Sequence, residues 1–424
     1  MGRNARSRLP GNIAGNRVQQ FHETGSIRKK WKNRVPVALI YPNRYGLGMS
    51  NLGFQLVYHL LNQNDSVVAE RVFFPEKEAQ PLSRESGRPL ADFPLLFFSV
   101  SFEHDYQHLV MMLKMAGIAP LASERAEKSG KIAALAAKGQ PLVVAGGVAT
   151  FMNPEPLAPF VDLFIVGEAE PVLGPVMERI LASIGAEDRE ELLAALGATI
   201  PGCYPPALYQ VTYDADGTLL ENKPRAQYDG LPDRISKVQI DSPGSAAPHS
   251  KILSSGAEFS DLFMVELGRG CSRGCRFCAA GFIYRPPRLW SAETIINAID
   301  ARPEATSRVG LLGMEMARPK DIAAIADYLS RQACSLSFSS LRADIINSPL
   351  LKLLGSSGLK SAAVAPDGAS ERLRLVINKG ITEPDVLTAV ELLAEQGIGN
   401  IKLYFMIGLP TESRADLEEM VTLV

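Results

Sequence analysis

The first half of the chain alternates short apolar runs with stretches whose apolar residues recur at helical spacing. The apolar runs predict strands, and the periodic stretches predict helices. Strands that alternate with helices predict a parallel, doubly wound sheet whose ligands bind beyond the carboxyl ends of the strands. We therefore expect a Rossmann-like α/β domain over 35–185. Its predicted strands are 35–41, 67–73, 95–100, 142–145 and 163–166, and its predicted helices are 51–61, 106–116, 131–137 and 170–181.

The alternation stops between residues 186 and 257, where Pro, Gly and Ser residues cluster. Within this segment, the β-rich runs 209–213 and 219–222 flank an Asp-Ala-Asp-Gly turn and predict a hairpin. We interpret the segment as a connector with a small β element. No repeat of fixed period is visible, which excludes a solenoid or a propeller.

The alternation returns over 258–424 and predicts a partial (β/α) barrel, with the chemistry on the loops that follow the strands. Only five strands are visible, and the helix after the fifth is cut short. A missing sixth strand would leave an edge unpaired, so we expect the sequence to be truncated after the fifth strand. The predicted strands are 262–267, 309–312, 335–339, 361–365 and 401–407, and the predicted helices are 292–301, 321–331, 350–354, 385–395 and one from 414.

The composition is that of a globular protein. Of the 424 residues, 46% are hydrophobic and 21% are charged, which excludes wholesale disorder. The longest apolar runs are far shorter than the roughly 18 residues of a membrane-spanning helix, so no membrane partner is expected. The N-terminus lacks the apolar core of a signal peptide, and we therefore expect a cytoplasmic protein.

The charge is distributed unevenly along the chain. Residues 1–34 contain nine Lys or Arg and one acidic residue, Glu23, whereas the remainder has ten more acidic than basic residues. A basic N-terminal arm of this kind either binds a polyanion such as RNA or only keeps the chain in solution. Both interpretations remain open from the sequence.

Three of the five cysteines, Cys271, Cys275 and Cys278, lie close together directly after the first strand of the barrel. In a reducing compartment such a cluster holds metal more often than it forms disulfides. Three thiolates can bind three irons of a four-iron cluster and leave the fourth open to another ligand. Zinc is the alternative, but it needs a fourth ligand, and no histidine lies within twenty residues of the three cysteines.

The C-x3-C-x2-C spacing, with Phe277 just before the last cysteine, resembles the radical S-adenosylmethionine (SAM) superfamily. The resemblance implies that the three cysteines hold a [4Fe–4S] cluster whose unique iron chelates SAM, and that Phe277 packs beside the adenine. One-electron reduction then cleaves SAM to methionine and a 5'-deoxyadenosyl radical. The electron would come from a donor such as flavodoxin or ferredoxin.

Further positions resemble the superfamily's SAM site, each with a turn or barrel-core role as the alternative. Glu315, after the second strand, would accept the SAM ammonium group beside Gly313. After the third strand, Ser340 would bond the ribose or carboxylate and Arg342 would pair with the carboxylate. The positions expected under the adenine, after the fifth strand, are Ile407 and Gly408.

The α/β domain in front of the barrel resembles a cobalamin-binding module. Gly146 and Gly147, after the fourth strand, would let a flat ligand approach the backbone, or would only form a tight turn. The Asp-x-His-x-x-Gly signature that supplies a histidine to cobalt is absent from 41–53. The whole layout resembles an uncharacterised radical SAM family with a cobalamin-binding-like N-terminal domain.

The leading hypothesis is a radical SAM enzyme that acts on an unidentified substrate. A cobalamin-dependent methyl or alkyl transferase is the alternative within the same class. A non-catalytic iron–sulfur or RNA-binding scaffold is the alternative from another class.

Overall fold

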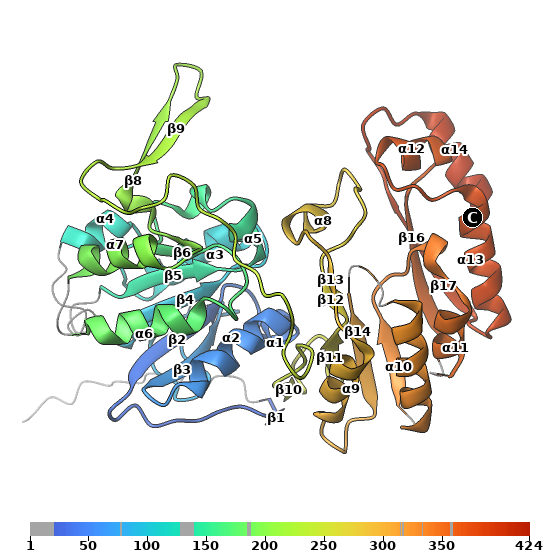
Figure 1. Cartoon of the computed structure of the whole chain (residues 1–424), viewed down its shortest axis with the longest axis horizontal. Coiled ribbons are helices and arrows are strands. Elements are labelled where there is room, and N and C mark those ends of the chain that lie inside the picture. Colours follow the sequence, from blue (N-terminus) through green and yellow to red (C-terminus); the bar gives the residue numbers. More distant parts are fainter. Residues whose placement is uncertain are drawn as a thin grey trace, which may run out of the picture.

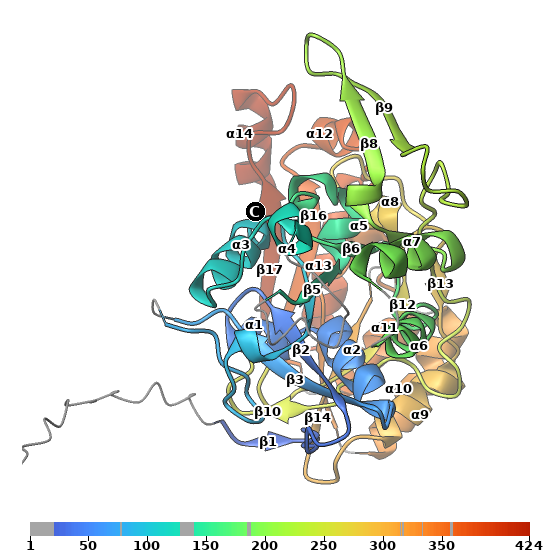
Figure 2. The ribbon, with the colours of Figure 1, turned by 90° about the vertical axis from the view of Figure 1, so that its left-hand side faces the viewer.

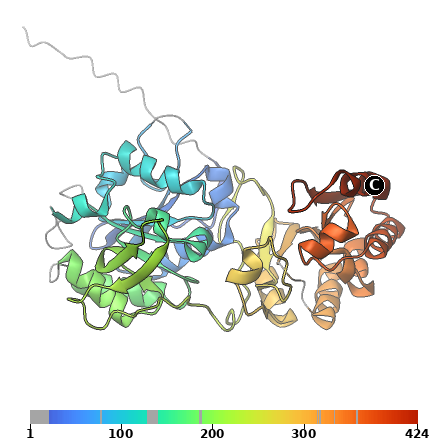
Figure 3. The ribbon, with the colours of Figure 1, turned by 90° about the horizontal axis from the view of Figure 1, so that it is seen from above.

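A computed structural model describes residues 21–76, 79–127, 140–184, 188–313, 315, 318–332, 334–356 and 359–424. Two α/β bodies lie side by side, one built from the first half of the chain and one from the second (Figures 1 and 3). The predicted doubly wound domain and the predicted partial barrel are both present. The predicted helix at 131–137 lies outside the described residues.

The first body contains a six-stranded sheet in the order β3-β2-β4-β5-β6-β7. Strands β2 to β6 run parallel, as predicted, and their side chains are almost entirely buried because helices cover both faces. The strands are β2 (Val35–Tyr41), β3 (Val67–Phe73), β4 (Leu95–Ser99), β5 (Leu142–Gly146), β6 (Leu163–Ile165) and β7 (Cys203–Tyr204).

Two of the longer helices, α2 and α7, begin where capping chemistry favours them. The side chain of Asn51 accepts a hydrogen bond from the Phe54 amide at the start of α2, and Asp188 forms a capping box with Glu191 at the start of α7. The helices of this body are α1 (Tyr45–Met49), α2 (Leu52–Gln63), α3 (Asp105–Met115), α4 (Ala122–Glu127), α5 (Val148–Met152), α6 (Leu173–Ser183) and α7 (Arg189–Thr199).

The sheet extends beyond residue 185 into the segment that the sequence pattern assigns to the connector. Strand β7 pairs antiparallel with β6, and Leu192 and Leu196 of α7 are buried in the same core. The predicted hairpin is confirmed as β8 (Tyr209–Tyr213) and β9 (Leu219–Pro224), which project from the body (Figures 1 and 2).

The second body is an open, barrel-like succession of parallel strands. Strands β11, β14 and β15 form one sheet and β16 and β17 form another, and a parallel bridge between Leu341 and Val364 connects the two. The strands are β11 (Phe263–Glu266), β14 (Arg308–Leu312), β15 (Ser335–Phe338), β16 (Ser361–Gly368) and β17 (Asn400–Met406). The helices are α8 (Ala280–Ile283), α9 (Ala292–Asp300), α10 (Pro319–Arg331), α11 (Ser348–Ser356), α12 (Glu371–Val376), α13 (Glu383–Glu395) and α14 (Arg414–Leu423).

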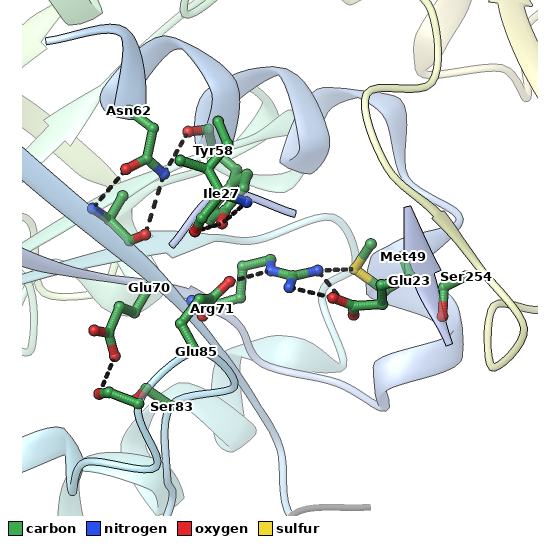
Figure 4. Close-up of polar contacts among 12 residues, drawn as sticks. Glu23, Ile27, Met49, Tyr58, Asn62, Glu70, Arg71, Ser83, Glu85 and Ser254 are labelled. Atoms are coloured by element: carbon green, nitrogen blue, oxygen red, sulfur yellow. Dashed lines mark hydrogen bonds and ion pairs between the residues drawn. The ribbon is translucent and has the colours of Figure 1, made fainter. Parts of the chain in front are cut away.

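A strap formed by residues 21–34 packs along the first body. Its strand β1 (Glu23–Thr24) pairs with β10 (Leu253–Ser254), which precedes the barrel. The buried Arg71 guanidinium forms ion pairs with Glu23, through Nη2, and with Glu85, through Nε, each at 2.7 Å (Figure 4). The strap is therefore part of the folded core.

In the described part of the basic arm, two cationic side chains form hydrogen bonds to the backbone of the first body. Lys29 donates to backbone carbonyls at the end of α2, including that of Asn64 at 2.9 Å, and Arg34 donates to the carbonyl of Asp65. These contacts weaken the RNA interpretation for residues 21–34, whereas residues 1–20 lie outside the described chain. Among the described residues, no helix has both the length and the apolar character needed to span a bilayer.

Candidate active site

The cysteine loop follows β11 and is shaped by two glycines. Gly268 belongs to the short strand β12 (Gly268–Arg269), which pairs with β13 (Arg288–Leu289), and Gly270 adopts a φ of +87°. A Cβ atom on Gly270 would lie 2.3 Å from the carbonyl oxygen of Tyr284. The loop therefore returns against its own backbone, and only glycine allows this approach.

The three cysteines of the loop are free thiols, and each has a nitrogen donor nearby. The amides of Arg273 and Gly281 donate to Cys271 Sγ and Cys278 Sγ at 3.4 Å, and Arg342 Nη1 lies 3.9 Å from Cys275 Sγ. Such donors stabilise thiolate charge and tune iron–sulfur clusters. The soft thiol donors and their surrounding N–H groups fit a [4Fe–4S] cluster.

Zinc fits the site less well. Cys203 and Cys334, two candidates for a fourth ligand, are packed into separate apolar cores. In the chain as described, no three His, Cys, Asp or Glu side chains converge on one metal ion. A cubane does not require such convergence because each thiolate binds a different iron.

Several residues from the other barrel loops contact the cysteine loop directly. Glu315 accepts hydrogen bonds from the amide and the hydroxyl of Ser272 at 2.9 and 2.7 Å. Arg342 donates to the carbonyl of Lys379 at 2.8 Å, and Lys379 Nζ lies 5.9 Å from the centre of the half-exposed Phe277 ring. The structure therefore brings Glu315, Arg342 and Phe277 to the cysteines.

The remaining predicted SAM contacts, Gly313, Ser340, Ile407 and Gly408, have other surroundings. Gly313 lines the cavity described below, and its carbonyl accepts a hydrogen bond from Ser339 at 3.3 Å. Ser339 and Ser340 are both exposed. Ile407 is 72% exposed, and the amide of Gly408 donates to Glu412 in the turn after β17.

A cavity of about 460 Å³ lies between the carboxyl ends of the first sheet and the part of the barrel formed by β12 and the carboxyl ends of β11 and β14. Its wall on the first body is mostly apolar. The polar exceptions are Ser50, Asn51, Ser99, Ser101, Glu168 and Glu170. Both bodies contribute to the lining, so the cavity joins the predicted cobalamin-binding module to the predicted SAM site. The apolar lining residues of the first body include Leu39, Leu56, Val57, Phe97, Phe98, Val144, Phe151 and Leu173.

The two glycines expected to contact cobalamin, Gly146 and Gly147, line this cavity but differ in their surroundings. Gly147 has a φ of +110°, and a Cβ atom there would lie 2.4 Å from the carbonyl oxygen of Val100. A Cβ atom on Gly146 would meet nothing closer than 3.5 Å. Backbone packing therefore explains Gly147 without a ligand, whereas it leaves Gly146 unexplained.

A buried charged network contributes Glu168, Glu170 and Arg269 to the lining of the cavity. Glu168 and Glu170, in the loop after β6, pair with Arg269 at 3.1 and 2.7 Å, and Arg288 binds both oxygens of Glu168 at 2.6 and 2.8 Å. Burial would raise the pKa of Glu168, but the hydrogen bond from Arg288 and the charge of Arg269 outweigh this effect and lower it. Glu168 is therefore held as a carboxylate.

In the sequence, residues 166–170 resemble a Gly-Glu turn of the cobalamin-binding module. The sequence pattern assigned no role to Arg269 or Arg288, although a signal for their contact with this turn exists. Glu168 and Glu170 follow β6, and Arg269 follows β11, so each stands at the carboxyl end of a parallel strand. Their opposite charges could have suggested a contact between the two bodies. Tyr284, also in the lining, has its pKa raised to about 12 by burial and is a neutral phenol at ordinary pH.

Two family models match most of the chain. Residues 53–206 match the family described as radical SAM proteins, N-terminal, and residues 265–424 match the radical SAM superfamily. The first match covers the α/β body, and the second begins within β11 and includes the cysteine loop.

Two curated relatives are similar in sequence. The uncharacterized protein MJ0966 of Methanocaldococcus jannaschii is 30% identical over 394 residues, which cover 91% of this chain and 72% of that protein. The uncharacterized methyltransferase PH0819 of Pyrococcus horikoshii is 22% identical over 256 residues, or 58% of this chain and 52% of that protein.

Two solved structures share the fold. The cobalamin-dependent SAM radical enzyme OxsB with aqua-cobalamin bound superposes on 92% of this chain with a TM-score of 0.61 and 14% identity, and the chain spans about half of it (52%). The radical SAM methyltransferase TsrM from Kitasatospora setae superposes on 92% of this chain and 71% of its own, with a TM-score of 0.53 and 15% identity. Because the two family models match the α/β body and the barrel with its cysteine loop, we conclude that this chain belongs to the radical SAM superfamily of enzymes, whose members bind a [4Fe–4S] cluster and SAM.

Proposed function

We propose that this enzyme cleaves SAM reductively and that Cys271, Cys275 and Cys278 hold its [4Fe–4S] cluster. The observation that carries the proposal is the set of three free thiols on one glycine-bounded loop at the carboxyl end of β11. When bound, the cluster and SAM supply an electron and a carbon radical for an unidentified substrate. An electron donor of the flavodoxin or ferredoxin type is part of the proposal.

The surrounding residues have assigned roles in this proposal. Arg342, held by Asp344 and by the Lys379 carbonyl, places a cation near Cys275 that suits the SAM carboxylate. Glu315 would receive the SAM ammonium group by exchanging its hydrogen bonds with Ser272. Phe277 offers a half-exposed ring for stacking, and the assignments of Gly313, Ser340, Ile407 and Gly408 stay as predicted from the sequence.

Anaerobic reconstitution with iron and sulfide tests the cluster assignment. The parent protein should bind about four irons per chain and release 5'-deoxyadenosine from SAM under dithionite. Cys275→Ala should lose both properties. Cys334→Ala is the matched control, since the two cysteines are equally buried, at 8% exposure, and Cys334 lies in the barrel core. A Cys275→Ala protein with a full cluster and unchanged SAM cleavage would refute the assignment.

A second candidate is cobalamin-dependent methyl or alkyl transfer, which the interdomain cavity favours. The cavity opens onto Gly146 on one side and Gly313 on the other, so a ligand on the first sheet would lie next to the barrel. OxsB and TsrM, which share the fold, are both described with bound cobalamin. The lining residues from the 41–53 segment are Ser50, Asn51, Leu52 and Gly53, so this segment contributes no histidine to the cavity.

Hydroxocobalamin provides the test of this candidate. After incubation and gel filtration, the protein should retain about one corrinoid per chain, with the spectrum of a cobalamin that has no histidine ligand. A protein that elutes colourless at every concentration tested would rule out cobalamin as the ligand of the cavity.

A further inference from the structure

One side chain, Arg269, contacts carboxylates from both bodies. Its Nη1 and Nη2 atoms pair with Glu168 and Glu170 of the first body, and its Nε atom binds the two oxygens of Glu266 in β11 at 3.0 and 3.1 Å. The Arg269 side chain is only 11% exposed. A planar guanidinium with donors on three sides suits this arrangement, whereas a lysine ammonium could not span it.

The partner loop on the first body is itself tightly held. Gly167 has a φ of +136°, and a Cβ atom there would lie 2.3 Å from the carbonyl oxygen of Val238. The amide of Glu168 donates to the same carbonyl at 2.9 Å, and the amide of Ile240 donates to the Glu168 carboxylate. Arg288 also donates to the carbonyl of Ile240 at 2.6 Å. Hydrogen bonds to the Glu168 loop and to Arg288 therefore hold the connector at Val238 and Ile240.

Arg269 is also placed directly before the cysteine loop. It lies two residues before Cys271, with Gly268 and Gly270 on either side. The β12–β13 pairing holds the backbone of Gly268 and Arg269 within the barrel, and the side-chain contacts of Arg269 connect this start of the loop to the first body. Buried charges are costly unless paired, and this network therefore favours one arrangement of the two bodies.

We propose that Arg269 is a positioning residue that fixes the cysteine loop relative to the first body through Glu168 and Glu170. This inference rests on the proposed function, because the role of Arg269 would be to set the distance between the ligand of the interdomain cavity and the cluster. The contacts themselves do not depend on any bound group.

Hydrogen exchange of the full chain, measured without the cluster, tests whether these contacts hold the cysteine loop in place. Glu170→Gln removes a carboxylate of the first body, and residues 270–285 of the barrel should then exchange about tenfold faster, since one charged hydrogen bond is weakened. Glu178→Gln, an equivalent change on the exposed side of α6, is the matched control and should leave this exchange unchanged. Equal exchange in all three proteins would overturn the proposal.

The reduction potential of the cluster in the reconstituted proteins is a second measurement, and a purely structural role of Arg269 would not change it. Removing the negative charge of Glu170 leaves Arg269 less neutralised, so the cluster's reduction potential should rise in a redox titration followed by electron paramagnetic resonance. Arg269→Lys keeps the charge but cannot contact three carboxylates, so it should reproduce the faster exchange with a smaller change in potential. An unchanged potential in Glu170→Gln would overturn the role toward the cluster. A parent protein that binds no iron would instead refute the proposed function and leave the exchange result intact.

Discussion

At the residue scale, an alanine at Gly147 should affect the stability of the fold, whereas an alanine at Gly146 should affect ligand binding. Gly147→Ala forces a Cβ atom against the Val100 carbonyl at a φ of +110°, and should destabilise the fold by about 1–3 kcal/mol. Gly146→Ala has room for its methyl group, so its stability should match that of the parent while hydroxocobalamin binding weakens if the corrinoid lies on this glycine. Urea unfolding and corrinoid retention measure the two effects. A Gly146→Ala protein that loses stability but retains full corrinoid binding would contradict this division.

At the element scale, the strap over residues 21–34 depends on Arg71 of β3. Arg71→Met leaves Glu23 and Glu85 buried without their cation and should cost about 3–5 kcal/mol in the free energy of unfolding. In the parent, burial alone would raise the pKa of Glu23, but the hydrogen bond and charge of Arg71 outweigh it and lower the pKa. Arg414→Met is the control, since that side chain is 92% exposed and should change little.

For Arg71→Met we also expect the stability to depend on pH with a sign opposite to that of ordinary acid denaturation. In the parent, burial outweighs the effect of Arg71 at Glu85 and already raises the pKa of that carboxyl. Without Arg71, burial should raise the pKa of both carboxyls above the unfolded value of about 4.3. The folded variant then binds protons more tightly than the unfolded chain, so the lost stability should partly return as the pH falls through the raised pKa values. Urea unfolding at several pH values measures this. A difference from the parent that stays constant between neutral and acid pH would show that the cost has another origin.

At the scale of the whole molecule, the apolar cores of the two bodies share no buried residue among those that the structure describes, and polar groups connect the bodies beside the cavity. Calorimetry should therefore resolve more than one unfolding transition. A ligand in the interdomain cavity contacts both bodies and should raise both transitions, by about 2.7 kcal/mol in total at a hundred times its Kd. Hydroxocobalamin is the probe, and a shift confined to one transition would place its site within one body.

The pattern of apolar residues was sufficient to predict most of the fold. The strands β2 and β3 coincide with their predicted ranges, because buried parallel strands read as continuous apolar runs. The βα alternation of the barrel is confirmed through β17. The assignment of the chain to the radical SAM superfamily was also predictable, since the spacing of three cysteines on one loop is a local property of the sequence. The short strand β7 was not predicted, because its two residues carry no periodic signal.

Only the tertiary structure decided how these parts meet. Glu168, Arg269 and Arg288 are separated by up to 120 residues, and each looks like an ordinary charged residue until folding buries them together. Likewise, the sequence could not distinguish Gly147, which the Val100 backbone requires, from Gly146, which it does not. Local spacing carries the chemistry of the cysteine loop, whereas the contacts that orient this loop toward the cavity are non-local and exist only once both bodies have folded.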